Sequence, residues 1–533
     1  MTDMNRHASY SSLKQKYETG QISRRGFLQG AAAMGLLTTA AAAAKPAQAA
    51  EPKKGGKMRI GTYHGQTADN LDPALLFNGA QWMIAYAVRN TLTQIEAGAT
   101  LAPCLATEWS PNANATTWVF KLRQNVEFHD GKPLTVDDVI ASLNRHRGEN
   151  SESAVKPIAD QMKDIRADGP NTLVIDLVKP NVDFPYSLAS ANFTICKADG
   201  DGIDATSGIG TGGYVLKEYE PGVRAILERN PNYWRDDRAH ASTVELLTIA
   251  DPTARINAIM SDGVDVIDEI EFKAVSRLIN VDGISVEKTQ GPLHYLFSMM
   301  SDRAPFESND VRLALKYACD REALIQKVLS GHGTIANDQP IGPSYRYHDA
   351  SLEQRAYDPD KAKFHLKKAG LDSLDLNISA GAAAFGGAVD AATVLQESAK
   401  PANINITVVR EPADGYWTNV YMNKPMFTNY WGGYTTSSQM FSTGYLPGAA
   451  WNESMFENDR FVEVLQQANA ELDTDRRAEM IAELQALVRD EAGQLIWSFP
   501  DNILATNGKL GHNELASDRP LDGRHIIERW WVA

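Results

Sequence analysis

Short runs of apolar residues along this chain change between two spacings. Residues 58–61 and 118–122 have the lengths and residue types of β-strands, whereas Val139, Ile140 and Leu143 recur at the spacing of one helix face. Strand and helix patterns follow one another from residue 56 onward, which indicates α/β architecture. Further helices are predicted to begin near residues 252, 309, 321 and 359, two more cover 461–468 and 481–487, and further strands cover 214–219 and 264–267.

One predicted helix start carries a strong local signal. Thr135 and Asp138 stand three residues apart, directly before and within the first turn of the helix expected from Val136. In this variant of the capping box, each of the two side chains accepts a hydrogen bond from the backbone N–H of the other residue. The spacing therefore predicts the first residue of this helix as well as its presence.

Composition excludes several classes of protein. The chain has 533 residues, 43% of them apolar, which is enough to build cores and rules out a disordered or fibrous protein. Its 67 acidic and 52 basic residues give a net charge of −15, which disfavours binding to nucleic acid. We find no run of 18 apolar residues after residue 50, so we expect a soluble mature protein.

The first 50 residues have the layout of an export signal. Two adjacent arginines precede a weakly apolar stretch at 31–44, which ends in an A-x-A cleavage pattern. This order is typical of the twin-arginine signal, and no cysteine at the cleavage point provides for a lipid anchor. We therefore expect a protein exported to the periplasm, with the export signal at Arg24, Arg25, Phe27 and Leu28 and cleavage around Ala47 and Ala49.

A search for reactive chemistry finds little. The eleven histidines are scattered without ligand spacing, so no metal site is predicted. The string at 208–213 fits G-x-G-x-x-G, but a strand is expected after it, whereas a dinucleotide site needs a helix there. Cys104, Cys196 and Cys319 allow at most one disulfide, and we favour three buried thiols. Nothing in the sequence argues for catalysis.

Aromatic residues are concentrated in one segment. Residues 416–451 contain ten aromatics, about 28% of the segment, against 8% for the whole chain. Gly432 and Gly433 follow Trp431, and glycine allows a ligand to approach the backbone. Part of this segment must be core, but its aromatic side chains also suit a ligand-binding wall.

Several blocks together resemble the periplasmic solute-binding proteins of peptide and nickel ABC importers, the extracellular solute-binding family 5. The most specific block runs from the Trp118 strand through the Asp130-Gly131 turn to Val139, and the similarity continues in order over nearly all of residues 55–533. The blocks that carry the resemblance are 105–109, 118–139, 210–214, 229–234, 309–321 and 357–363.

The resemblance implies a two-lobed α/β fold of the Venus-flytrap type, with a hinge and an extra subdomain in the N-terminal half. It also implies a protein that is not an enzyme and that hands its solute to a membrane permease. We further expect no cofactor and no metal, a monomer, and the twin-arginine export machinery as a second partner. The expected parts are the signal peptide (1–50), lobe I (51–90, 206–300 and 506–533), the extra subdomain (91–205) and lobe II (301–505).

One departure from the family bears on the solute. Peptide-binding members resemble Trp-x-x-Asp where this chain has Trp431 to Tyr434, and that aspartate binds the α-ammonium of the peptide. Glu411 and Asp414 are the candidates to replace it. By the resemblance, the expected ligand-binding residues are Tyr63, His64, Trp417, Trp431, Gly432, Gly433 and Tyr434.

The sequence leaves the solute open. An oligopeptide and a non-peptide such as an opine or a sugar conjugate both suit an aromatic wall, and nickel or haem binding is the alternative within the same fold. A secreted hydrolase is a remote alternative. We expect Trp431→Ala to weaken solute binding and to leave the fold intact.

Overall fold

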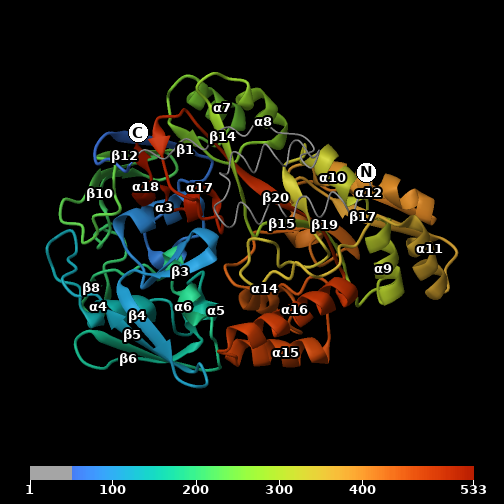
Figure 1. The fold of residues 1–533 in the computed structure, drawn as a ribbon, viewed down its shortest axis with the longest axis horizontal. Coiled ribbons are helices and arrows are strands. Elements are labelled where there is room, and N and C mark those ends of the chain that lie inside the picture. Colours follow the sequence, from blue (N-terminus) through green and yellow to red (C-terminus); the bar gives the residue numbers. More distant parts are fainter. Residues whose placement is uncertain (1–50) are drawn as a thin grey trace, which may run out of the picture. The chain divides into compact units, whose positions relative to one another are not determined.

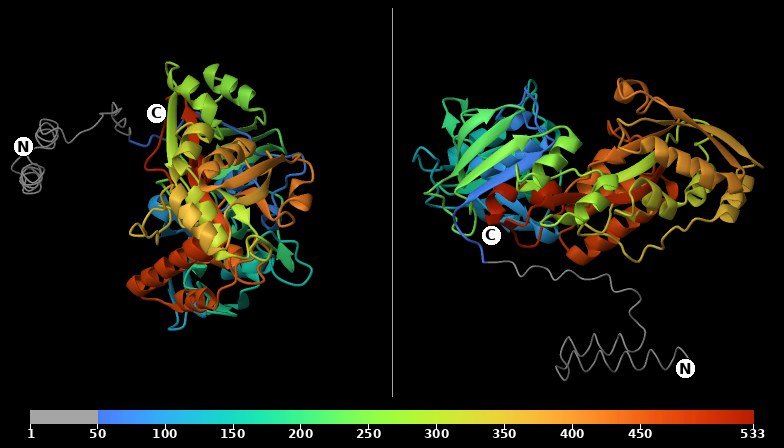
Figure 2. Two further views of the ribbon diagram at one scale, coloured as in Figure 1. Left: turned by 90° about the vertical axis from the view of Figure 1, so that its right-hand side faces the viewer. Right: turned by 90° about the horizontal axis from the view of Figure 1, so that it is seen from above.

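The computed structural model describes residues 51–533, so the predicted export signal and its cleavage region lie outside the described residues. A mixed β-sheet of 12 strands forms the centre of the described part, and its main path runs β10-β11-β12-β1-β13-β20-β15-β19-β17-β18 (Figure 1). We call the part built on β10 to β13 the first lobe and the part built on β15 to β18 the second lobe. Figure 2 shows the two lobes side by side from above.

The first lobe begins at the predicted strand around residue 58. Met58 and Ile60 of this strand are fully buried, and the strand pairs in parallel with two later segments of the chain. The strands of this lobe are β1 (Lys57–Thr62), β10 (Tyr214–Glu220), β11 (Arg224–Arg229), β12 (Thr243–Thr248) and β13 (Val266–Ile267). Its helices are α3 (Gly79–Val88), α7 (Pro252–Met260), α8 (Phe272–Ile279), α17 (Pro520–Gly523) and α18 (Ile526–Arg529).

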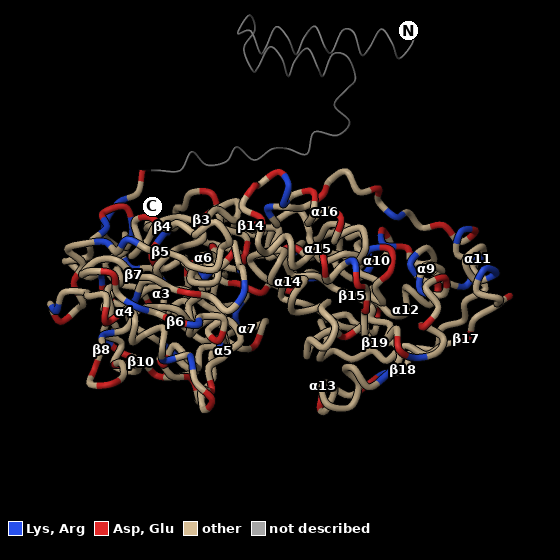
Figure 3. The backbone as a smooth tube through the Cα atoms, turned by 90° about the horizontal axis from the view of Figure 1, so that it is seen from below, with Lys and Arg blue, Asp and Glu red and all other residues tan. Residues whose placement is uncertain are grey.

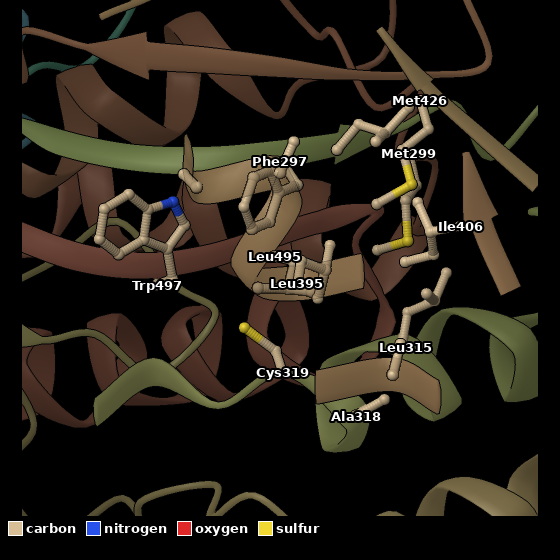
Figure 4. Packing of buried hydrophobic residues seen from close by; sticks show 14 of the residues in the cluster. Phe297, Met299, Leu315, Ala318, Cys319, Leu395, Ile406, Met426, Leu495 and Trp497 are labelled. Atoms are coloured by element: carbon tan, nitrogen blue, oxygen red, sulfur yellow. The ribbon is translucent and has the colours of Figure 1, made fainter. Parts of the chain in front are cut away.

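The second lobe has its own core. Phe297 and Trp497 come from adjacent strands and pack with Leu395 of a covering helix and with Cys319, which directly follows another (Figure 4). The strands of this lobe are β15 (His294–Met299), β16 (Gly333–Ile335), β17 (Leu374–Ala380), β18 (Ile404–Arg410) and β19 (Met426–Trp431). Its helices are α9 (Asn309–Ala318), α10 (Arg321–Val328), α11 (Pro359–Lys368), α12 (Ala388–Ala399), α13 (Tyr416–Asn419), α14 (Ser437–Gly444), α15 (Asp459–Ala470) and α16 (Thr474–Glu491).

One long strand, β20 (Gln494–Thr506), belongs to both lobes. Its first part pairs with β15 and β16 of the second lobe, and its last part pairs with β13 and with β14 (Ser285–Gln290) of the first. Nearly all of its side chains are buried. The two lobes are therefore joined through a continuous hydrogen-bonded ladder as well as through the chain.

A separate four-stranded antiparallel sheet forms the extra subdomain. Its core contains Trp118 and Phe120 of the predicted strand at 118–122, packed against Val139 and Leu143 of α4 (Val136–Asn144). The capping box of Thr135 and Asp138 is present as predicted. The sheet order is β4 (Ala106–Pro111), β5 (Thr117–Leu122), β7 (Thr172–Leu177) and β6 (Met162–Ala167), and two short helices, α5 (Lys156–Ala159) and α6 (Phe184–Ser187), lie beside it.

The glycine-rich string at 208–213 serves packing. A Cβ at Gly210 would lie 2.0 Å from the carbonyl oxygen of Val88, and a Cβ at Gly212 would lie 2.4 Å from that of Ala87. The string therefore passes directly against the end of α3, and β10 follows it as predicted. His129 accepts a hydrogen bond from the Gly210 N–H through its Nδ1, and its Nε2 lies 3.1 Å from the Gly212 carbonyl oxygen.

Most of the other predicted elements are present, with one shorter than expected. The strand predicted at 264–267 is reduced to β13, because Asp265 turns its carboxylate to the side chain of Arg59 on the neighbouring strand. All three cysteines are buried and free, as favoured. No helix within residues 51–533 combines the length and apolar character needed to cross a membrane.

Candidate functional site

A pocket of about 360 Å³ lies between the two lobes. The first lobe supplies residues 269–273, the second lobe supplies Tyr295, Val328 and Asp390, and β20 supplies residues 501–503. Because both lobes and the shared strand line it, a change in the angle between the lobes changes the shape of this pocket. None of the seven residues expected from the family resemblance is among the residues that line it.

The segment after β13 places one carboxylate, that of Glu269, at this pocket and a second, that of Asp268, in the buried position before it. Asp268 is 1% exposed, and its Oδ2 accepts hydrogen bonds from Thr62 Oγ1 at 3.1 Å and from Arg524 Nη1 at 2.9 Å. Glu269 follows with a left-handed backbone, at φ 51°. Arg255 holds the turn, because its guanidinium donates to the carbonyl oxygens of both residues, at 3.2 and 2.8 Å.

Tyr63 and His64, two of the expected residues, lie beside this segment. Their rings are 4.0 Å apart, and His64 Nε2 accepts a hydrogen bond from Arg524 Nη2 at 2.8 Å. Burial and the adjacent guanidinium lower the pKa of His64 to about 4, so its imidazole is neutral at physiological pH. Tyr63 is half-exposed, and Arg255 lies 5.8 Å from the centre of its ring.

The ligand atoms of His64, Asp268 and Glu269 lie within 4.8 Å of one another, so these three residues could hold a metal ion. The donor set fits a metal poorly. The Nε2 lone pair of His64 already accepts from Arg524, and a guanidinium at this distance repels a divalent cation. The cluster is better suited to groups that donate hydrogen bonds to carboxylates.

The second lobe carries a group of aromatic side chains, which we call the aromatic wall, and its member Tyr295 lines the pocket. Tyr295 of β15 and Tyr430 of β19 face each other in the strand register, and Tyr295 is stacked on Phe385 with ring centres 4.1 Å apart. Trp417, one of the expected residues, meets the Tyr430 ring edge to face at 5.9 Å. Trp417 and Tyr430 are 45% and 42% exposed, so their apolar faces are open to a ligand.

Trp431 lies on the other side of β19 from Tyr430, since successive side chains of a strand alternate. It is only 8% exposed and packs against Tyr434 and Trp451, at 6.3 and 6.2 Å between ring centres. Gly433 has φ +74° and lies against Pro292, a conformation and a closeness that favour glycine. The assignment of Trp431, Gly432, Gly433 and Tyr434 to the site thus stays a prediction, with Trp431 in a core position.

A carboxylate does lie beside the Trp431 indole, but it is Glu453 and it is fully buried. Ser298 and Gln494 donate to its Oε1 at 2.6 and 2.9 Å, and Asn429 donates to its Oε2. Burial raises the pKa of Glu453 to about 7, against the opposing effect of these donors and of the nearby Trp431 N–H. Because its oxygens are engaged and closed off, Glu453 is not open to a solute.

The two acids considered as replacements for the family aspartate differ in environment. Glu411 accepts a hydrogen bond from Ser379 Oγ at 2.8 Å and is partly exposed, whereas Asp414 is exposed in the loop before α13. Neither lines the pocket between the lobes.

The acidic and aromatic residues of the pocket were missed from the sequence. Glu269, Asp268 and Tyr295 are not part of any motif, and Arg524 reaches Asp268 across 256 residues of chain. One signal was available: Asp265, Asp268 and Glu269 stand in and directly after a buried strand, where polar side chains often mark the edge of a sheet.

Comparison with known proteins agrees with this architecture. The chain is 25% identical over 482 residues to "Probable D,D-dipeptide-binding periplasmic protein DdpA" of Escherichia coli, covering 84% of this chain and 90% of the relative. It is 26% identical over 326 residues to Heme-binding protein A of Haemophilus influenzae, covering 56% and 59%. The periplasmic binding protein DppA of Helicobacter pylori, solved with the peptide STSA, superposes with a TM-score of 0.72 at 20% identity, covering 90% of this chain and 98% of that one.

These structural matches confirm the predicted two-lobed α/β fold. The sequence model described as "Bacterial extracellular solute-binding proteins, family 5 Middle" matches residues 100–453, which span the extra subdomain and much of both lobes. The chain therefore belongs to the bacterial extracellular solute-binding proteins of family 5.

Proposed function

We propose that this protein captures an organic solute in the pocket between its lobes and delivers it to the permease of an ABC importer. The observation that carries the proposal is the pocket itself, which both lobes and the shared strand β20 line. A solute enclosed there holds the lobes at one angle, because closure buries it against both walls. The permease then distinguishes loaded from empty protein by that angle.

The proposed contacts come from both sides. Tyr63 and His64 of the first lobe and Trp417 of the second lie on exposed or partly exposed surface near the acidic segment and the aromatic wall. Trp431, Gly432, Gly433 and Tyr434 support that wall from behind, where Trp431 packs in the core. The same proposal includes the division of the chain into lobe I (51–90, 206–300 and 506–533), the extra subdomain (91–205) and lobe II (301–505).

The proposed solute is an oligopeptide or a non-peptide such as an opine or a sugar conjugate. A relative named for D,D-dipeptides and a neighbour solved with the peptide STSA support an organic solute of this size. Nickel or haem binding, named for two other relatives, is the alternative within the fold. The pocket of about 360 Å³ suits a small peptide or sugar derivative better than a porphyrin.

We further propose that the protein works in the periplasm as a monomer without a lipid anchor, exported by the twin-arginine machinery, and that it binds without chemical conversion. Figure 3 shows acidic and basic residues interspersed along both lobes, which accords with a partner other than nucleic acid. Changing Arg24 and Arg25 together to lysine is expected to keep the precursor in the cytoplasm. Unchanged export of that variant would overturn the twin-arginine proposal.

Native mass spectrometry of protein purified without denaturation tests the binding function. We expect a mass increase from a retained solute that disappears when the protein is unfolded in acid. The mass and its fragments then choose between peptide, non-peptide and haem. A protein that retains nothing and binds no component of a peptide and metabolite mixture would overturn the proposal.

A further inference from the structure

We propose that Glu269, with Asp268 behind it, binds a primary or secondary ammonium group of the solute. This inference rests on the proposed function and adds the chemical class of the solute, together with the group that anchors it.

The carboxylate of Glu269 has no hydrogen-bond donor among residues 51–533. It lines the pocket between the lobes, and His64 Nε2 lies 4.0 Å from its Oε1, beyond hydrogen-bond distance. Its side chain is 44% exposed, so a solute can reach it, while the surrounding walls exclude much of the bulk water. That enclosure raises the pKa of Glu269, and the neighbouring Asp268 raises it further.

Asp268 adds a second unsatisfied oxygen at the same place. Its Oδ2 is held by Thr62 and Arg524, but its Oδ1 has no donor within the described part of the chain, although the side chain is 99% buried. Ligand atoms of Asp268 and Glu269 approach within 4.8 Å. Buried polar atoms are almost always hydrogen-bonded, so this pair calls for a donor that the described residues do not supply.

The backbone holds Glu269 in a conformation that folding alone does not favour. Its φ of 51° is uncommon for a residue with a side chain, and such residues concentrate at functional sites. Arg255 donates to the carbonyl oxygens on both sides of the turn and to those of Ile249 and Ala250. The carboxylate is therefore aimed before the solute arrives, which lowers the cost of binding.

Aromatic rings complete a site for a cation. Tyr295 lines the pocket with Glu269. Burial raises the pKa of both Tyr295 and Tyr63, and the negative charge of Glu269 raises each pKa further. Tyr430, also half-exposed, acts on both phenols in the same way. Ring faces attract an ammonium group, and its N–H bonds suit two carboxylates.

An ammonium fits these groups better than a metal ion does. A divalent cation needs at least three ligands, and the third one available, His64 Nε2, is engaged by Arg524. An ammonium needs only acceptors on one side, and its alkyl part can lie against the tyrosine rings. Asp268 already pairs with Arg524, so of these two carboxylates Glu269 is the one without a charged partner at bonding distance.

The test compares solutes with free and with blocked amines. Mature protein is freed of retained solute by reversible unfolding in guanidinium chloride. It is then incubated with a tryptic digest of casein supplemented with glucosamine and putrescine, or with the same mixture after complete N-acetylation. Native mass spectrometry identifies what is retained, and isothermal titration measures the affinity of the retained component for wild type, Glu269→Gln and Glu228→Gln. Glu228 is an exposed glutamate on β11 of the first lobe that does not line the pocket, and it provides the matched control.

We expect retention from the untreated mixture only. Glu269→Gln should weaken binding about 10- to 100-fold, the usual effect of removing a charged hydrogen-bond partner, and Glu228→Gln should stay within about twofold. Three results would overturn the inference. The first is equal retention from the acetylated mixture, and the second is an unchanged affinity of Glu269→Gln with an unchanged melting temperature. The third is retention of Ni²⁺ or Zn²⁺ in place of an amine. If the protein is purified from the periplasm with a solute that has no amine, this inference is overturned and the proposed function stands. If it retains no solute from the periplasm or from the mixtures, both are overturned.

Discussion

Asp183 of the extra subdomain and Arg477 of the second lobe form a buried bidentate ion pair. The two guanidinium nitrogens lie 2.7 and 2.5 Å from the two carboxylate oxygens, and both side chains are at most 10% exposed. Beside the pair, the N–H of Val182 donates to the carbonyl oxygen of Asn469 at 3.0 Å. The extra subdomain is therefore fastened to α15 and α16 of the second lobe, although the chain enters and leaves it through the first lobe.

Breaking this ion pair should destabilise the protein strongly. Asp183→Ala leaves the Arg477 guanidinium buried without its carboxylate, and we expect a loss of about 3–5 kcal/mol in the free energy of unfolding, measured in urea. Replacing both partners, as in Asp183→Leu with Arg477→Met, should restore most of that loss. Asp160→Ala, which removes the exposed pair of Asp160 with Lys156, serves as the control and should change little. A loss from Asp183→Ala no larger than that of the control would contradict the buried pair.

Trp431 and Tyr430 should respond in opposite ways to truncation. The burial of Trp431 changes the expectation from the sequence, because Trp431→Ala empties a core position and should cost about 3–5 kcal/mol of stability. Tyr430→Ala removes a half-exposed ring and should weaken solute binding with little loss of stability. Urea unfolding and titration with the solute recovered by native mass spectrometry separate the two effects. A stable Trp431→Ala variant with weakened binding would instead place the indole in the site.

The two glycines after Trp431 should differ sharply in their tolerance of alanine. A Cβ at Gly433 would lie 2.4 Å from the Pro292 Cβ, on a backbone at φ +74°. We expect Gly433→Ala to cost at least about 1–3 kcal/mol, seen as a lower melting temperature. Gly432→Ala is the matched control, because its Cβ would meet no atom closer than 3.6 Å. Similar melting temperatures for the two variants would argue against this backbone geometry.

Glu453 should make the stability fall as the pH rises. Its pKa is about 7 in the folded protein and near 4.5 when unfolded, so between these values the unfolded chain releases the proton that the folded protein keeps. The resulting loss is about 3 kcal/mol across this window and is complete above pH 7. Histidines with lowered pKa act in the opposite direction, so the measurement is the difference between wild type and Glu453→Gln.

We expect Glu453→Gln to gain stability relative to wild type as the pH rises from 4.5 to 7, in urea unfolding at several pH values. Glu457→Gln, which changes an exposed carboxylate four residues later, should show a constant difference. A constant difference for Glu453→Gln as well would show that its carboxyl ionises normally.

The sequence predicted local features well and the pocket poorly. Three predicted features depend on neighbours within a few residues, and all are present. They are the capping box at Thr135, the strand after the glycine-rich string and the helix after Asp251. The pairing of Arg524 with Asp268 depends on the return of the C-terminal segment to the first lobe, which no local pattern encodes. The aromatic segment was recognised as mixed core and wall. The sequence did not show which of these aromatic residues are core and which are exposed. The strand register shows it, because Tyr430 and Trp431 are adjacent and point to opposite faces of β19.

The course of β20 determines which movements the lobes can make. Sliding one lobe past the other would break the ladders that β20 forms with strands on both sides, whereas a swivel needs only a local change of twist where its partners change, near Pro500 and Asp501. A rotation about β20 would therefore keep both ladders intact, and each closure would return the carboxylates of the first lobe and the aromatic rings of the second to the same alignment.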